Sequence, residues 1–83
     1  MKFNLFMYCT TGRRDELEAG LAGLNNDYYQ RMLAEIADIA RYADGHGWHG
    51  IGHPEHHLQI EGFEASNDLG LMASWIANAT EQL

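Results

Sequence analysis

The stretch NNDYYQRMLAEIADIARYADGHGWHGIG, residues 25–52, decides the fold. Apolar side chains recur in its first part at the 3.6-residue period of an amphipathic helix, and they are Tyr29, Met32, Leu33, Ile36, Ile39, Ala40 and Ala43. The polar residues at 25–27 are good N-caps, and the glycines of residues 44–47 can end the helix. We therefore predict a helix over residues 27–44, followed after a tight turn by a strand over residues 48–52.

The segments on either side continue this alternation. Residues 3–8 form a short, almost continuously apolar run, which is typical of a strand buried on both faces. A polar connection over residues 9–26 follows, and Asp15 to Leu21 within it has the composition of a short helix. Downstream, a second long connection over residues 53–67 leads to a predicted helix over residues 68–81. Asp68 caps this helix, and its apolar side carries Leu69, Met72, Trp75, Ile76 and Ala79.

The order of these elements indicates an α/β fold. A helix between two strands favours parallel pairing of the strands. Both connections from strand to helix are long, whereas the connection from helix back to strand is short. In TIM (β/α)8 barrels the strand-to-helix loops all lie at one face and build the active site. We therefore predict that residues 1–83 form a single partial barrel unit, the β-α-β-α N-terminal fragment of a TIM (β/α)8 barrel.

Charge and composition narrow the class of partner. The chain has 83 residues, with 12 acidic against 5 basic side chains and a formal net charge of -7. Such a charge repels phosphate backbones and anionic lipid headgroups, so we expect neither nucleic acid nor a membrane as partner. The single cysteine, Cys9, fits a reducing compartment. Because the sequence has no pattern typical of a signal peptide or a membrane span, we expect a cytoplasmic protein.

All five histidines fall within residues 46–57, next to a glycine pattern. Residues 45–50 match G-x-G-x-x-G, but they end a helix instead of opening one, so we interpret them as a helix stop and not as a nucleotide site. Imidazoles beside a carboxylate can ligate zinc. The glycines and the proline between His49 and His53 oppose the helix that would bring these two side chains together. We predict no metal site, and a small histidine-rich metal-binding protein stays as an alternative.

Residues 54–57, Pro-Glu-His-His, carry the most chemical information. They directly follow the second predicted strand, where barrel enzymes place catalytic groups. A histidine titrates near neutral pH, and an adjacent carboxylate can orient it or raise its pKa. A polar loop with satisfied histidines explains the same pattern, so spacing alone leaves both interpretations open.

Three stretches together resemble landmarks of the luciferase-like, flavin-dependent monooxygenases: Met1-Lys2-Phe3, residues 47–57 (GWHGIGHPEHH) and residues 66–68 (SND). The resemblance implies a TIM barrel that binds reduced FMN, or a deazaflavin in some relatives, and uses dioxygen to oxygenate an organic substrate. It implies His56 as the catalytic residue, with Tyr8, Glu55 and His57 in the cofactor-binding pocket. Residues 51–54 are smaller than the apolar residues usual in luciferases, so light emission is not implied.

The resemblance covers two of the eight strands of such a barrel. We therefore expect the isolated chain to bind FMN weakly or not at all, and to be inactive unless assembled. Open strand edges favour association with the remainder of the barrel or with further copies, a dimer more than a tetramer. A flavin reductase would supply the reduced cofactor. A non-catalytic assembly or flavin-binding module is the remaining alternative.

Overall fold

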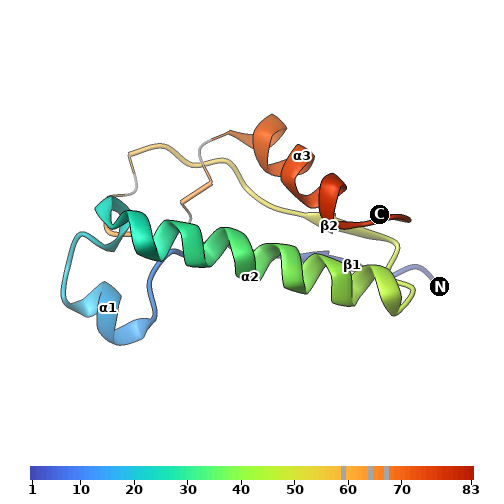
Figure 1. Cartoon of the computed structure of the whole chain (residues 1–83), viewed down its shortest axis with the longest axis horizontal. Helices are drawn as coiled ribbons and strands as arrows, with labels where there is room; N and C mark the ends of the chain where they lie inside the picture. Colours follow the sequence, from blue (N-terminus) through green and yellow to red (C-terminus); the bar gives the residue numbers. More distant parts are fainter. Residues whose placement is uncertain (59, 64, 67) are drawn as a thin grey trace.

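The computed structural model describes residues 1–58, 60–63, 65–66 and 68–83 as a small mixed α/β unit. In chain order its elements are β1 (Asn4–Phe6), α1 (Arg14–Glu18), the 3-10 turn η1 (Ala22–Leu24), α2 (Asn26–Gly45), β2 (Gly50–Gly52) and α3 (Leu69–Ala79). The long helix α2 runs along the strands, and α3 lies beside it (Figure 1). None of the helices in the described part of the chain is long and apolar enough to cross a membrane.

The two strands pair in parallel, as the intervening helix predicts. Leu5 is opposite Ile51 in the register, and the Met7 amide extends the ladder by donating to the Gly52 carbonyl at 2.9 Å. Both ladder segments are shorter than the predicted strands at residues 3–8 and 48–52. The backbone after Met7 leaves β2 because it is held by the later loop, where the Ala65 amide donates to the Cys9 carbonyl at 2.6 Å.

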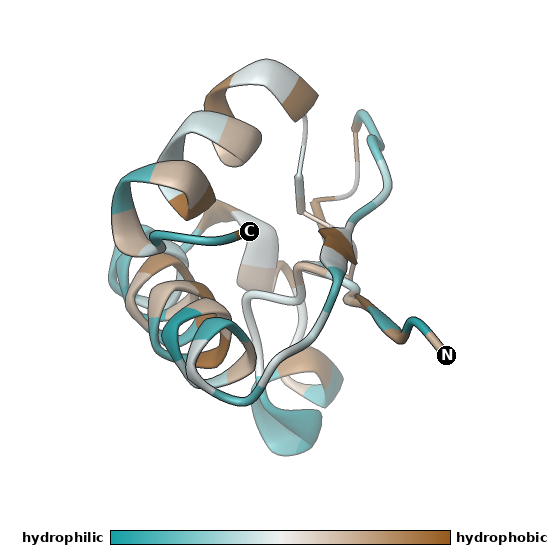
Figure 2. Cartoon of the chain, turned by 90° about the vertical axis from the view of Figure 1, so that its right-hand side faces the viewer, coloured by the Kyte–Doolittle hydropathy of each residue, from teal (hydrophilic) through white to brown (hydrophobic). Residues whose placement is uncertain are grey.

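Both long helices lie on the same side of this sheet. Figure 2 shows α2 and α3 together on one side of the strands, with the opposite side uncovered. Side chains alternate along an extended strand, so Met7 and Cys9 point into the helices while Phe6 and Tyr8 point away from them and are exposed. The core between sheet and helices consists of Met7, Cys9, Met32, Ile36, Ala40, Met72 and Ile76.

Local capping explains where α2 begins and ends. The Asn25 side chain accepts a hydrogen bond from the Tyr28 amide at 3.1 Å, which satisfies one of the free amides of the first turn. The helix ends at Gly45, and Gly47 follows with a φ of 76°, a conformation that glycine adopts without strain. The helix is one residue longer at each end than the predicted range of residues 27–44.

The other helix, α3, ends earlier than the predicted range of residues 68–81. Its N-terminus is capped by Asp68, whose carboxylate accepts a hydrogen bond from the Leu71 amide at 2.9 Å. At the other end, the amides of Glu81, Gln82 and Leu83 donate to the Asp44 carboxylate at 2.8–3.1 Å. These three bonds draw the chain away from the helical path, and they hold the pKa of Asp44 below its usual value.

Candidate functional site

The segment after β2 folds back across the end of β1. The His56 amide donates to the Ser66 carbonyl at 2.8 Å, and the Thr11 amide donates to the Gly62 carbonyl at 2.8 Å. The bond from Thr11 to Gly62 and the bond from Ala65 to Cys9 tie the two strand-to-helix connections to each other, while the bond from His56 to Ser66 closes the second connection on itself. The residues that follow both strands therefore gather at the carboxyl-terminal edge of the sheet.

Glu55 and His57 are brought together at this edge. The His57 Nε2 atom lies 3.7 Å from Glu55 Oε2, with side chains 66% and 42% exposed, so the pair is ionic only when His57 is protonated. The other Glu55 oxygen accepts a hydrogen bond from the Leu69 amide at 3.2 Å. A carboxylate at a helix N-terminus is stabilised by the helix dipole. Glu55 is thus anchored to α3 and can orient the neighbouring imidazole.

His56 is half-buried between the exposed side chains of Glu55 and His57. Its position is fixed by its backbone bond to Ser66. His46 lies elsewhere, in the turn between α2 and β2, which is at the opposite end of the strands. There its Nδ1 is 2.7 Å from the Tyr42 carbonyl oxygen and its ring stacks on Tyr42 with centroids 3.9 Å apart. The structure therefore separates these two histidines.

Tyr8 belongs to an aromatic surface on the uncovered side of the sheet. Its ring stacks against Phe63 with centroids 5.7 Å apart, and the Phe6 ring meets it edge-on at 5.5 Å. All three rings are exposed, and Gly52 lies beneath the Phe6 ring with no side chain of its own. We call the surface formed by Phe6, Tyr8, Phe63, Gly50 and Gly52 the open sheet face. The sequence did not predict Phe63 as part of this surface, because a single aromatic residue in a loop carries no periodic signal.

The remaining candidates give no cluster of metal ligands. Among residues 1–58, 60–63, 65–66 and 68–83, no three histidine, cysteine or acidic side chains converge as a metal site would require. Cys9 is buried, and burial raises the pKa of its thiol, while a nearby Ser66 hydroxyl acts in the opposite direction. A buried, protonated thiol is a poor nucleophile. Residues 66–68 form the third stretch that resembles the monooxygenases, and of these Asn67 lies outside the described residues.

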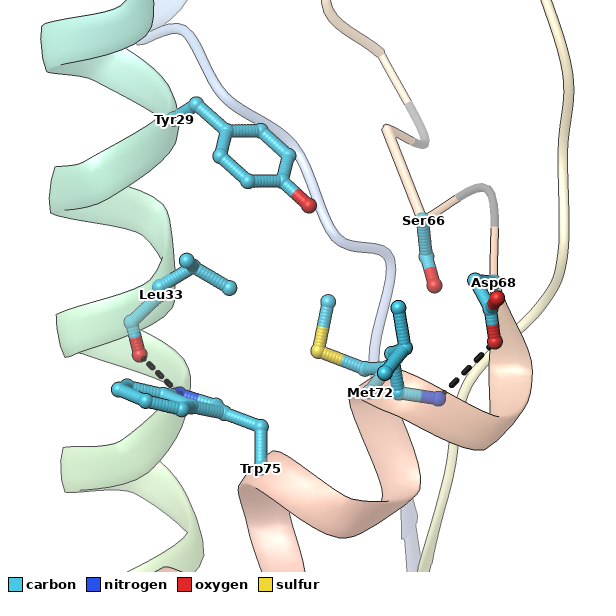
Figure 3. Close-up of a pocket in the computed structure, with 7 residues that line it drawn as sticks. Tyr29, Leu33, Ser66, Asp68, Met72 and Trp75 are labelled. Atoms are coloured by element: carbon cyan, nitrogen blue, oxygen red, sulfur yellow. Dashed lines mark hydrogen bonds between the residues drawn. The ribbon is translucent and has the colours of Figure 1, made fainter.

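A cavity of about 290 Å³ lies between α2 and α3, on the other side of the sheet from Tyr8. Figure 3 shows Tyr29, Leu33, Ser66, Met72 and Trp75 pointing into it. The periodicity predicted an apolar side on each of the two helices, and residues from both of these sides line the cavity. The cavity itself has no signature in the sequence because it results from imperfect packing of these sides.

Comparisons of this chain with protein-family models, with curated proteins and with solved structures found no match.

Proposed function

We propose that this chain is a β-α-β-α unit of a flavin-dependent monooxygenase barrel of the luciferase-like kind, which uses reduced FMN and dioxygen on an organic substrate. The observation that carries the proposal is the asymmetry of the sheet. Helices cover one side of a parallel strand pair, the other side is open and aromatic, and both long loops meet at the carboxyl-terminal edge. A (β/α)8 barrel is covered by helices outside and binds its ligands at this edge.

The residues of the open sheet face fit the ring system of a flavin. Tyr8 and Phe63 offer exposed, nearly parallel rings at an interplanar angle of 24°, and planar aromatic groups stack favourably on such surfaces. Gly50 and Gly52 have no side chains of their own, and the Asn4 and Phe6 side chains of β1 lie over them. The negative charge of the chain opposes the cofactor phosphate, so we assign the phosphate contacts to other strands of the assembled barrel. The isolated chain should accordingly bind FMN weakly.

His56, Glu55 and His57 have distinct roles in this proposal. His56 is the catalytic residue, which holds and moves protons at the reacting end of the site. Glu55, fixed by the Leu69 amide, orients His57 at the rim of the flavin pocket. Reduced flavin supplies the reaction with dioxygen when it is bound, and a flavin reductase supplies the reduced flavin. We place this chemistry in the cytoplasm, where the free thiol of Cys9 stays reduced.

The open sheet face also argues for assembly. Exposed aromatic rings on one side of a two-stranded sheet need further strands to cover them, either from the remainder of the barrel or from other copies of this chain. We favour a dimer over a tetramer, because a barrel closed from four equal parts requires matched strand shear at every seam.

Titration of FMN into the chain, followed through the ring resonances of its aromatic residues by NMR, tests the proposal. We expect high-micromolar binding that shifts Tyr8, Phe63 and His56 and leaves Tyr42 and His46 unchanged. The Tyr8→Ala variant should abolish the shifts, whereas the matched variant Tyr42→Ala should retain them. Shifts confined to Tyr42 and His46, or tight, stoichiometric binding of FMN by the isolated chain, would refute the proposal. Flavin binding without oxygenation by the assembled protein would favour the non-catalytic flavin-binding module.

A further inference from the structure

The cavity between α2 and α3 has the properties of a binding site that the flavin proposal does not use. It lies on the helix side of the sheet, so it is separate from the open sheet face. We propose that this cavity binds a small, neutral molecule with one aromatic ring and one hydroxyl group, a ligand of the phenol class.

Apolar side chains form most of the cavity wall. Leu33 contributes from α2, and Leu71, Met72 and Trp75 contribute from α3. The Trp75 indole is held in place because its Nε1–H donates to the Leu33 carbonyl at 2.8 Å, a bond that also links the two helices (Figure 3). Indole and thioether groups make favourable contacts with an aromatic ring. Leu71 and Trp75 are exposed at the rim, which gives a ligand a route from solvent.

One buried polar group also lies in the wall. The Ser66 hydroxyl is buried, with 1% of the residue exposed, and it has no hydrogen-bond partner among the described residues. The Ser66 hydroxyl lowers the pKa of the nearby Cys9 thiol, but a thiol is a weak hydrogen-bond partner and does not replace a hydroxyl or carbonyl group. A buried hydroxyl without a partner is unfavourable, and a ligand hydroxyl at this place would satisfy it. Figure 3 shows the Ser66 side chain pointing into the cavity.

Size and charge restrict the ligand further. A cavity of about 290 Å³ is roughly twice the volume of the ~150 Å³ cavity that is known to admit benzene, so it suits one ring with a short substituent. Asp68 at the edge of the cavity already accepts a bond from the Leu71 amide, and its carboxylate repels an anionic ligand. A cation would lose its hydration against the apolar walls. These conditions favour a neutral ring with a hydroxyl group that reaches Ser66.

Binding of p-cresol, with toluene and 4-methylbenzoate as comparison ligands, tests this proposal on the full chain. The reporter is the Trp75 indole N–H resonance, which the Trp48→Phe variant distinguishes from that of Trp48. We expect p-cresol to shift this resonance saturably and to bind about five- to tenfold more tightly than toluene, as one hydrogen bond provides. The carboxylate should bind more weakly than p-cresol.

The Ser66→Ala variant should lower the affinity for p-cresol to that for toluene, and the Ser74→Ala variant, with the same substitution at an exposed position of α3, should leave it unchanged. If Ser66→Ala fails to fold, the comparison of p-cresol with toluene on the unmodified chain still tests the proposal. No saturable shift, equal affinity for p-cresol and toluene, or tighter binding of 4-methylbenzoate would each overturn the proposal.

Discussion

Gly62 is the residue on which the closure of the second loop depends. Its carbonyl accepts hydrogen bonds from both the amide and the hydroxyl of Thr11, at 2.8 and 3.1 Å. Its φ of 98° lies in the region that favours glycine. A Cβ at this position would lie 2.9 Å from the Gly23 nitrogen and would also meet Thr11 and Ala22. Backbone conformation and crowding therefore both require glycine here.

We expect Gly62→Ala to lower the free energy of unfolding by at least about 2 kcal/mol, because positive φ and steric overlap both disfavour alanine. Gly45→Ala is the matched control. Gly45 ends α2 at an ordinary φ with nothing near its Cβ position, so alanine there should raise stability by about 0.5–1 kcal/mol. Urea unfolding of the two variants measures both effects. Equal stability of the two variants would contradict the contact between Gly62 and Thr11.

Among the helices and strands, the features that the sequence predicted correctly depend on residues close together in the chain. The features that it missed depend on contacts between distant residues. The apolar period from Tyr29 to Ala43 and the cap at Asn25 placed α2 to within a residue at each end, because both act within a few residues. The early end of β1 depends on the bond from Ala65 to Cys9, and the early end of α3 depends on Asp44. Those contacts join residues far apart in the sequence, and periodicity carries no information about them.

The candidate site likewise has residues that the sequence predicts and residues that it does not. Glu55, His56 and His57 could be recognised because they directly follow a predicted strand, and the structure brings Glu55 and His57 within contact. Phe63 and Ser66 could not be recognised, since their places depend on how the loop folds back over β1. The sequence therefore indicates the edge of the sheet where the candidate site lies, but not the full set of residues that line it.

The attachment of α1 to α2 depends on the ion pair between Glu16 and Arg31. Arg31 Nη2 lies 2.7 Å from Glu16 Oε1 and also donates a hydrogen bond to the Thr11 carbonyl. The Arg31 side chain is 29% exposed and the Glu16 side chain 15% exposed. The hydrogen bond from Arg31, together with one from the Arg13 amide, lowers the pKa of Glu16 from 4.5 to about 2. A lowered pKa means that the ionised carboxylate stabilises the folded state.

This pair should make stability depend on pH in the acidic range. Because the pKa of Glu16 is lower in the folded state, its contribution is complete above pH 4.5 and is lost as the pH falls towards about 2. Thermal unfolding of the Glu16→Gln variant should show a smaller loss of stability across this range than the unmodified chain. Glu18→Gln, which removes the exposed pair with Arg14, is the control and should leave the pH dependence unchanged. Identical pH profiles for Glu16→Gln and the unmodified chain would argue against the role of this pair.

The whole molecule is a sheet with one covered side and one open side. Phe6 and Tyr8 are 59% and 56% exposed on the open side, and Phe63 is 47% exposed beside them. Burial of a few hundred Å² of such surface on each chain stabilises an assembly by several kcal/mol, at about 25 cal/mol per Å², before the entropy cost of association. The same side carries Tyr8 and Phe63, which we propose to stack on the flavin, so assembly and cofactor binding should depend on one surface.

Sedimentation velocity across micromolar concentrations tests most directly the claim that the open sheet face is built to be covered by further strands. We expect the unmodified chain to sediment as a dimer or larger species. The Phe6→Asp variant should remain a monomer of 9.4 kDa, while Leu24→Asp, which places the same charge on an exposed leucine of η1, should associate as the unmodified chain does. A stable, cooperatively unfolding 9.4 kDa species of the unmodified chain at every concentration would contradict the account.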